Sequence, residues 1–131
     1  MMYVLDANSL VYFFKGMGRV GERLLSTPPR EIALPAIVLY ELEVGIAKSS
    51  SPEKRRAQLA DFLSIVNVLP FAEAEAKASA KIRAALEKVG RPIGPLDTLI
   101  AGTAMSHGAT LITHNVREFG RVEGLTIEDW F

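Results

Sequence analysis

The chain contains no cysteine among its 131 residues, which excludes disulfide bonds and metal sites built from thiolates. It also has no long hydrophobic run, since none approaches the roughly 20 apolar residues that a membrane-spanning helix needs. Neither sign of charge dominates, because 15 basic residues balance 15 acidic ones. Net charge therefore provides no general attraction for nucleic acids, and any such contact must come from local groups of basic side chains.

The first residues lack the basic segment of a secretory signal and reach Asp6 almost at once. The start therefore does not resemble a signal peptide, and because the absence of cysteine fits the cytoplasm, we expect a cytoplasmic protein with no membrane partner. Hydrophobic residues make up 49% and charged residues 23% of the chain, which is the composition of a globular protein. The length suits one domain, so we expect a single domain over residues 1–131.

Short β-rich runs alternate with longer helical patterns along the chain, and this alternation predicts an α/β fold with a parallel sheet flanked by helices. Strands are expected at Met2–Leu5, Glu31–Leu34, Asn67–Pro70 and Thr110–Thr113, with a weak edge strand near Thr126–Glu128. Proline and glycine mark several helix ends. The predicted helices are one after Asp6, a short one within Lys15–Arg30, and longer ones at Ala36–Ala47, Glu53–Ile65, Glu73–Val89 and from Pro95 to His107.

Four acidic residues follow apolar strands or strand-to-helix segments: Asp6, Glu41, Asp97 and Glu118. The carboxyl ends of parallel strands meet at one edge of a sheet, so we expect these side chains to lie together. Carboxylates that approach one another without a cation repel and tend to stay protonated. The pattern therefore predicts a site for a divalent cation or for acid/base chemistry.

Two of these acids also have a purely structural explanation. Asp6 precedes a helix, and aspartate is a good N-cap, so capping alone explains the residue equally well. Asp97 lies in the first turn of the helix opened by Pro95, where the helix dipole favours a negative charge. Capping and metal binding are compatible, because the carboxylate is ionised in both.

The helix Ala36–Ala47 is apolar on almost all sides, and we expect it to be buried. A buried carboxylate needs a cation or a strong hydrogen-bond donor beside it, and this applies to both Glu41 and Glu43. The two residues lie about 200° apart on the helix and cannot share one site. Gly45 leaves room for a ligand on the Glu41 face and favours Glu41. Alternatively, one of the two pairs with Lys48 or another base at the helix rim.

The strand that ends at Thr113 breaks into polar residues. His114 is a candidate general base or metal ligand, although a lone histidine in a loop is more often a surface residue. Arg117 and Glu118 are either part of a site or solvated loop charges. His107 stands at a helix C-terminus, where the dipole accounts for it.

Four segments of the chain, in this order and spacing, resemble those of the PIN-domain ribonucleases, and specifically of the VapC-type toxins of toxin–antitoxin pairs. The segments are Val4-Leu5-Asp6-Ala7-Asn8, Leu39-Tyr40-Glu41-Leu42-Glu43-Val44-Gly45-Ile46, Pro95-Leu96-Asp97-Thr98-Leu99-Ile100-Ala101 and Thr113-His114-Asn115-Val116-Arg117-Glu118-Phe119. The resemblance covers nearly the whole chain.

The resemblance implies a PIN-like α/β/α sandwich with a central parallel sheet of four to five strands. It implies that Asp6, Glu41 and Asp97 form an acidic core with Glu118 as a fourth, more variable acid, and it selects Glu41 over Glu43. Asn8 and Asn115 would support this site. Two positions depart from the family pattern: Ala7 replaces a hydroxyl residue, and the fourth acid is Glu rather than the more frequent Asp.

The chemistry implied is hydrolysis of RNA phosphodiester bonds. Hard oxygen ligands suit Mg²⁺ or Mn²⁺, whereas zinc sites usually recruit His or Cys. We expect Asp6 and Asp97 to be direct ligands, with Glu41 as a ligand through water or as the base. One or two cations would activate water and neutralise charge on the phosphate.

The expected partners are RNA, a small antitoxin protein and a second copy of the chain. Lys15, Arg19 and Arg117 are candidates for contacts with RNA phosphates, because they lie near predicted strand ends. By resemblance, the antitoxin would fill a hydrophobic groove between helices and offer a basic side chain to the acids. Homodimers are also usual in the family.

Two other functions fit parts of the sequence. A haloacid-dehalogenase-like phosphatase also begins with a strand ending in Asp and uses Mg²⁺, but its pattern needs a second Asp where this chain has Asn8. A PIN-like module that binds RNA or protein without catalysis would keep the fold while its acids bind no metal.

Overall fold

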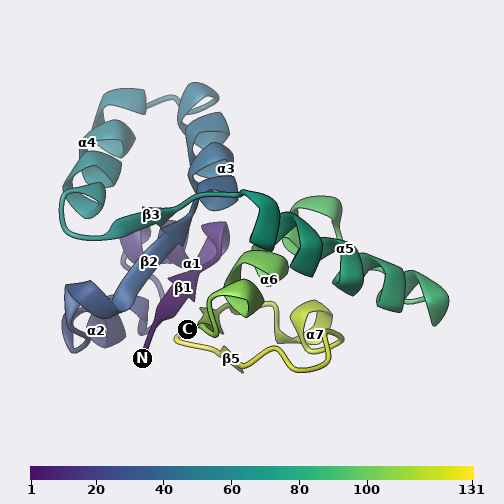
Figure 1. Cartoon of the computed structure of the whole chain (residues 1–131). Helices are drawn as coiled ribbons and strands as arrows, with labels where there is room; N and C mark the ends of the chain where they lie inside the picture. Colours follow the sequence, from purple (N-terminus) through teal and green to yellow (C-terminus); the bar gives the residue numbers. More distant parts are fainter.

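A sheet of five parallel strands runs through the centre of the computed structural model, which describes all of residues 1–131 (Figure 1). The strand order is β3-β2-β1-β4-β5, and every neighbouring pair is parallel. The strands are β1 (Tyr3–Leu5), β2 (Ile32–Pro35), β3 (Asn67–Leu69), β4 (Thr110–Ile112) and β5 (Ile127–Glu128). The predicted α/β fold and its parallel sheet are confirmed.

Helices connect the strands, as a parallel sheet requires. They are α1 (Ala7–Lys15), α2 (Val20–Leu25), the 3₁₀ turn η1 (Pro29–Glu31), α3 (Ala36–Ala47), α4 (Pro52–Leu63), α5 (Glu73–Lys88), α6 (Pro95–Ser106) and α7 (Val116–Phe119). The longer helices begin and end within two residues of their predicted bounds. The sequence analysis did not predict α7, whose single turn begins where the Asn115 side chain accepts a hydrogen bond from the Glu118 N–H. No helix of the molecule combines the length and the hydropathy that crossing a membrane requires.

The centre of the sheet contains a topological switch point. From β1 the chain continues through α1 toward β2 on one side, whereas from β4 it continues through α7 toward β5 on the other. The two connections diverge at the carboxyl ends of β1 and β4, and such a switch point is where ligands bind in open α/β sheets. Hydrophobic residues of the central strands anchor this region, and Val4, Leu5, Leu111 and Ile112 are fully buried.

Close packing of α5 on α6 supports the same edge of the sheet. A Cβ atom added at Gly102 of α6 would lie within 2.8 Å of the Cα and Cβ atoms of Ser79 in α5. Only glycine therefore allows the two helices to approach so closely, and this approach fixes α6, which carries Asp97 at its first turn.

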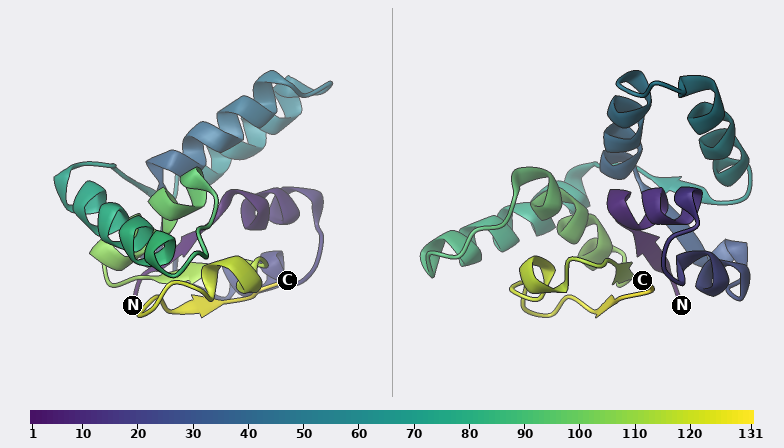
Figure 2. Two further views of the ribbon diagram at one scale, coloured as in Figure 1. Left: turned by 90° about the vertical axis from the view of Figure 1, so that its right-hand side faces the viewer. Right: turned by 180° about the vertical axis from the view of Figure 1, so that it is seen from behind.

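The expectation that α3 is buried is wrong. Only Val38, Leu42 and Ile46 are buried, whereas Tyr40 is 58% exposed. The reason is visible in Figure 2: α3 and α4 form a pair of helices that stands out from the body of the domain, so one face of α3 meets no other layer. An apolar helix face is consequently left on the surface.

Candidate active site

Asp6 lies directly after β1 at the switch point and is 5% exposed. Its Oδ1 atom accepts a hydrogen bond of 2.9 Å from the Ser9 N–H and caps α1. Its Oδ2 atom accepts a hydrogen bond of 2.6 Å from the Thr113 hydroxyl, which follows β4. Capping therefore engages one oxygen of Asp6, and a residue that follows β4 engages the other.

A chain of hydrogen bonds links Asp6 to Glu118. The fully buried Thr113 donates to Asp6, and its hydroxyl oxygen accepts a bond of 3.0 Å from the Asn115 N–H. The Asn115 side-chain amide in turn donates to Glu118 Oε2 at 2.9 Å. Asn115 thus lies next to Glu118, whereas the contact of Thr113 with Asp6 was not predicted. The register that pairs Leu5 with Ile112 places Thr113 opposite Asp6. This register cannot be predicted from the sequence near either residue.

Glu41 and Glu43 have opposite environments on α3. Glu43 is exposed and forms a salt bridge of 3.0 Å with Arg56. Of the two glutamates, Glu43 is therefore the one that pairs with a basic side chain. Glu41 is partly buried, and its Oε1 atom is buried without a hydrogen-bond partner. Burial, followed by the negative charges of Asp97 and Asp6, raises the pKa of the Glu41 carboxyl.

Asp97 occupies the first turn of α6 and is partly buried. Its pKa is raised to about 6, first by burial and then by the charge of Glu118, the charge of Asp6 and a hydrogen bond with Glu118. The charges of Asp97 and Asp6 act on Glu41, and those of Glu118 and Asp6 act on Asp97. The four carboxylates Asp6, Glu41, Asp97 and Glu118 therefore form one electrostatic cluster. We call these four residues the acid cluster.

The acid cluster does not have the geometry of a metal site in this structure. No three acidic or histidine side chains converge closely enough to coordinate one ion. Both oxygens of Asp6 are engaged by Ser9 and Thr113, and the mutual repulsion of the carboxylates opposes closer approach. The donor set nevertheless fits a hard divalent cation. All its ligand atoms are carboxylate oxygens, and the buried Oε1 of Glu41 lacks the partner that a cation would supply.

A groove of about 450 Å³ opens beside Glu41 between α1, α3 and α4. Its walls are largely apolar, and it contains Gly45, which leaves open space in front of its backbone. We call it the Glu41 groove. Its polar lining residues include Asn8, Lys15 and Arg55. Arg55 lines the groove because α4 packs beside α1, a placement that the local sequence does not indicate.

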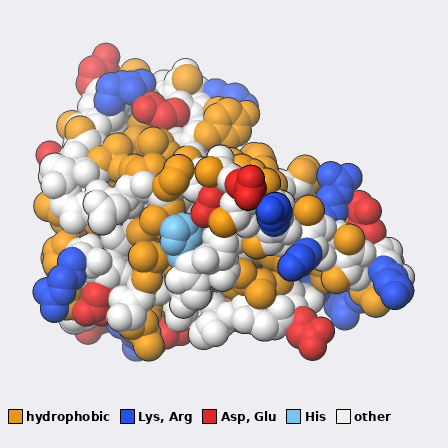
Figure 3. Space-filling model, in the orientation of Figure 1, with side chains coloured by type: hydrophobic (Ala, Val, Ile, Leu, Met, Phe, Trp, Pro, Cys, Tyr) orange, Lys and Arg blue, Asp and Glu red, His pale blue; other side chains and the backbone are white.

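The remaining predicted side chains lie on the surface. Arg19 and Arg117 are exposed, and on the face shown in Figure 3 positive and negative side chains alternate in small groups. His114 is exposed and hydrogen bonds Asp129, and His107 ends α6 and hydrogen bonds Glu75. Although burial of Asp129 acts in the opposite direction, the Phe131 N–H and His114 lower the pKa of Asp129. Neither histidine is part of the acid cluster.

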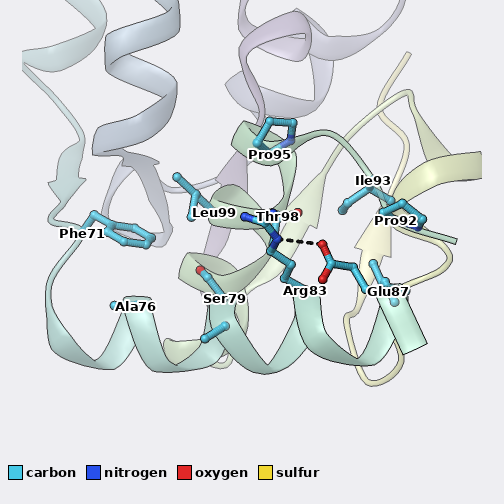
Figure 4. A pocket seen from close by; sticks show the side chains of 12 residues that line it. Phe71, Ala76, Ser79, Arg83, Glu87, Pro92, Ile93, Pro95, Thr98 and Leu99 are labelled. Carbon is cyan, nitrogen blue, oxygen red and sulfur yellow. Dashed lines mark hydrogen bonds and ion pairs between the residues drawn. The ribbon is translucent and has the colours of Figure 1, made fainter. Parts of the chain in front are cut away.

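A second cavity, of about 550 Å³, lies between α5 and α6 (Figure 4). Phe71, Ile93 and Leu99 line it, and an ion pair of 2.9 Å between Arg83 and Glu87 closes one side. No carboxylate of the acid cluster reaches this cavity. The candidate active site is therefore the acid cluster with the Glu41 groove.

The raised pKa of Asp97 predicts how stability changes with pH in the metal-free protein. A group whose pKa is higher in the folded state stabilises the fold when protonated, and this contribution is lost as the pH rises from 3.8 through about 6. Asp97→Asn keeps the shape and removes the charge. In the presence of a chelator, the variant should match the wild type near pH 4 and exceed it by roughly 1 kcal/mol above pH 7, allowing for solvent screening.

Urea unfolding at a series of pH values measures this difference. Asp61→Asn, which removes an exposed carboxylate from α4, is the control and should change little across the same range. A stability difference for Asp97→Asn that stays constant with pH would show that the fold does not raise the pKa of Asp97.

Comparisons with known proteins agree with this geometry. A family model described as the PIN domain matches residues 3–125. The tRNA(fMet)-specific endonuclease VapC of Shigella flexneri is 36% identical over 130 residues, covering 99% of this chain and 98% of the relative. Ribonuclease VapC2 of Rickettsia felis is 36% identical over 132 residues, covering 99% and 98%.

Solved structures show the same relationship. VapBC2 from Rickettsia felis, bound to a DNA fragment from its promoter, contains a chain with a TM-score of 0.93 and 34% identity, and each chain is covered completely. DNA-bound VapBC from Salmonella typhimurium gives a TM-score of 0.92 and 36% identity over 100% of this chain and 99% of the other. Because the family model spans most of the chain and full-length relatives exceed 30% identity, this protein belongs to the PIN-domain family, within its VapC group of ribonucleases.

Proposed function

We propose that this protein is an endoribonuclease that depends on Mg²⁺ or Mn²⁺ and acts as the toxin of a toxin–antitoxin pair. The observation that carries the proposal is the acid cluster at the switch point, where burial and like charge raise the pKa of Asp97 and Glu41. Such an arrangement is unfavourable for stability, so it requires a functional explanation. The phosphatase alternative is set aside, because the chain belongs to the PIN family.

Within this site each residue has a distinct role. Asp6 and Asp97 would hold the cation, which when bound supplies an acidified water and neutralises charge on the phosphate. Glu41, with its raised pKa, accepts a proton more readily than an ordinary carboxylate and suits the role of base toward the attacking water. Asn115 holds Glu118 at the margin of the site.

The substrate is an RNA whose phosphates are held by basic side chains around the acids. Lys15 lines the Glu41 groove, and Arg19 and Arg117 are exposed. Because two relatives are named tRNA(fMet)-specific endonucleases, tRNA(fMet) is the first RNA to test, together with a pool of other transfer RNAs and ribosomal fragments.

Cleavage of this pool should occur in Mg²⁺ or Mn²⁺ and stop with a chelator, and Asp97→Asn should abolish it. Glu41→Gln should lower kcat/KM by about 100-fold or more, which is the usual effect of losing a general base. Glu43→Gln is the matched control: it changes an exposed acid on the same helix and should retain nearly full activity. Equal loss in both variants would remove Glu41 from the mechanism.

Calorimetric titration with Mn²⁺ separates this function from that of a non-catalytic module. The wild type should bind Mn²⁺, and Asp6→Asn should weaken the binding. If the wild type binds no metal and cuts no RNA, the function that remains is that of a non-catalytic binding module.

We further propose that a small antitoxin protein occupies the Glu41 groove. Several similar solved structures are VapBC toxin–antitoxin complexes. The groove offers apolar walls from Val11, Phe14 and Ile46, with Glu41 at its edge. An amphipathic segment that carries a basic residue would fill it, because the apolar side chains bury surface and the cation pairs with an otherwise unpartnered carboxylate.

Gly45→Leu tests this binding mode. Nothing lies within 4 Å of a Cβ atom at Gly45, so leucine fits the fold but projects into the space that the antitoxin would take. The variant should cut RNA while resisting inhibition by the antitoxin encoded with it, and Ala57→Leu, on an exposed position of α4 outside the groove, should remain inhibited. Inhibition of both variants alike would place the antitoxin elsewhere.

The exposed apolar surface of the helical pair fits a second copy of the chain. Tyr40 and Val44 of α3 are 58% and 37% exposed, and hydrophobic side chains gather over the helical pair in Figure 3. Monomeric proteins seldom leave such a patch uncovered. Sedimentation should therefore find a homodimer that Tyr40→Glu converts to a monomer, and a monomeric wild type would refute the assignment.

A further inference from the structure

His114 stands between two residues that contact the acid cluster. The preceding residue, Thr113, donates a hydrogen bond to Asp6, and the following residue, Asn115, donates one to Glu118. The His114 side chain instead contacts Phe131 and Asp129. It is therefore next to the site in the chain without being part of the acidic chemistry.

The imidazole ring of His114 is held rigidly. It stacks on the Phe131 ring with centroids 4.3 Å apart and planes inclined by 25°, and Tyr12 packs edge-on at 6.0 Å. A hydrogen bond of 2.9 Å joins its Nδ1 atom to Asp129. Stacking, the edge contact and the hydrogen bond together leave the ring one orientation.

The support beneath His114 is also fixed. The Phe131 carbonyl accepts a hydrogen bond of 2.8 Å from the Arg19 N–H, and the Phe131 N–H donates one of 2.9 Å to Asp129. Gly18, at a φ of 63°, lies so close to the Phe131 ring that an added Cβ would sit 2.9 Å from it. The position of the ring thus depends on the backbone of the turn between α1 and α2.

Despite this support, 47% of the His114 side chain is exposed. Phe131 stacks on one face of the imidazole, so a flat ligand would approach from the opposite face. A residue that served only to pack Phe131 would gain more by being buried. A rigid ring with one open face is instead the form of a surface that stacks flat ligands.

We propose that His114 is a stacking platform for an unpaired base of the RNA substrate, beside the phosphate that is cut. The proposal rests on the proposed ribonuclease function and adds a contact to the base. Aromatic side chains stack any base, because every base has a π face. The exposed Arg19, whose backbone N–H donates to the Phe131 carbonyl, would contact the neighbouring phosphate. Since a stacked base must leave its own helix, the cut should fall in a loop or single strand.

Two substitutions separate the ring from its hydrogen bond. His114→Phe keeps an aromatic face and loses the bond to Asp129, whereas His114→Asn keeps a polar side chain and loses the ring. The probe is a stem–loop oligonucleotide that carries the cut mapped for the wild type in the RNA pool. We expect His114→Asn to raise KM about ten-fold with a smaller change in kcat, and His114→Phe to stay within about two-fold of the wild type.

Changing the RNA provides a second, independent test. Abasic nucleotides are placed one at a time on either side of the cut. At one position the missing base should raise the KM of the wild type and of His114→Phe about ten-fold. It should not raise the KM of His114→Asn further, because this variant has already lost the stacking contact.

Several outcomes would overturn the platform. If His114→Asn is weaker than the wild type by the same factor on intact and on abasic RNA, His114 only supports the fold. A loss in His114→Phe with wild-type kinetics in His114→Asn would assign the effect to the Asp129 bond, and wild-type kinetics in both variants would remove the contact altogether. In all three cases the ribonuclease function stands, whereas a wild type that cuts no RNA refutes that function first.

Discussion

Repulsion among four carboxylates is the constraint on which the rest of this structure depends. Asp6, Glu41, Asp97 and Glu118 come from four different parts of the chain, and the fold holds them together although like charge and burial disfavour it. The molecule accommodates them unequally. Asp6 receives two hydrogen bonds, whereas burial and like charge raise the pKa values of Asp97 and Glu41. Ligands for a cation and a group that takes up protons can thus coexist in one small region.

The framework that imposes this crowding is the pairing of β1 with β4. Their parallel register brings the residue after each strand to the same edge, so the Thr113 hydroxyl meets Asp6 across the sheet. The tight approach of α5 to α6 at Gly102 then fixes the helix that carries Asp97. Both contacts lie in the best-buried part of the molecule, and rigid support of this kind is what a charged site needs if it is to keep its geometry.

The helical pair α3 and α4 has a different relation to the core. It is anchored by one face, and its other face and the Glu41 groove present apolar surface to partners. A single helix therefore supplies a buried anchor, an acidic residue of the site and an exposed surface. The same division occurs after β4, where Thr113 and Asn115 serve the acids and His114 between them faces outward.

The amino-acid sequence by itself determined the order, type and approximate ends of the elements, because helical and strand periodicity, prolines and glycine caps act within a few residues. It also contained the four acids at the ends of predicted elements. Three features were decided only by tertiary structure: the burial of Glu41 rather than Glu43, the bond from Thr113 to Asp6 over 107 residues, and the entry of Arg55 into the groove. Each depends on which strands become neighbours and on which face of a helix meets the core. These are long-range choices set by the packing of the whole chain, and no short stretch of sequence contains them.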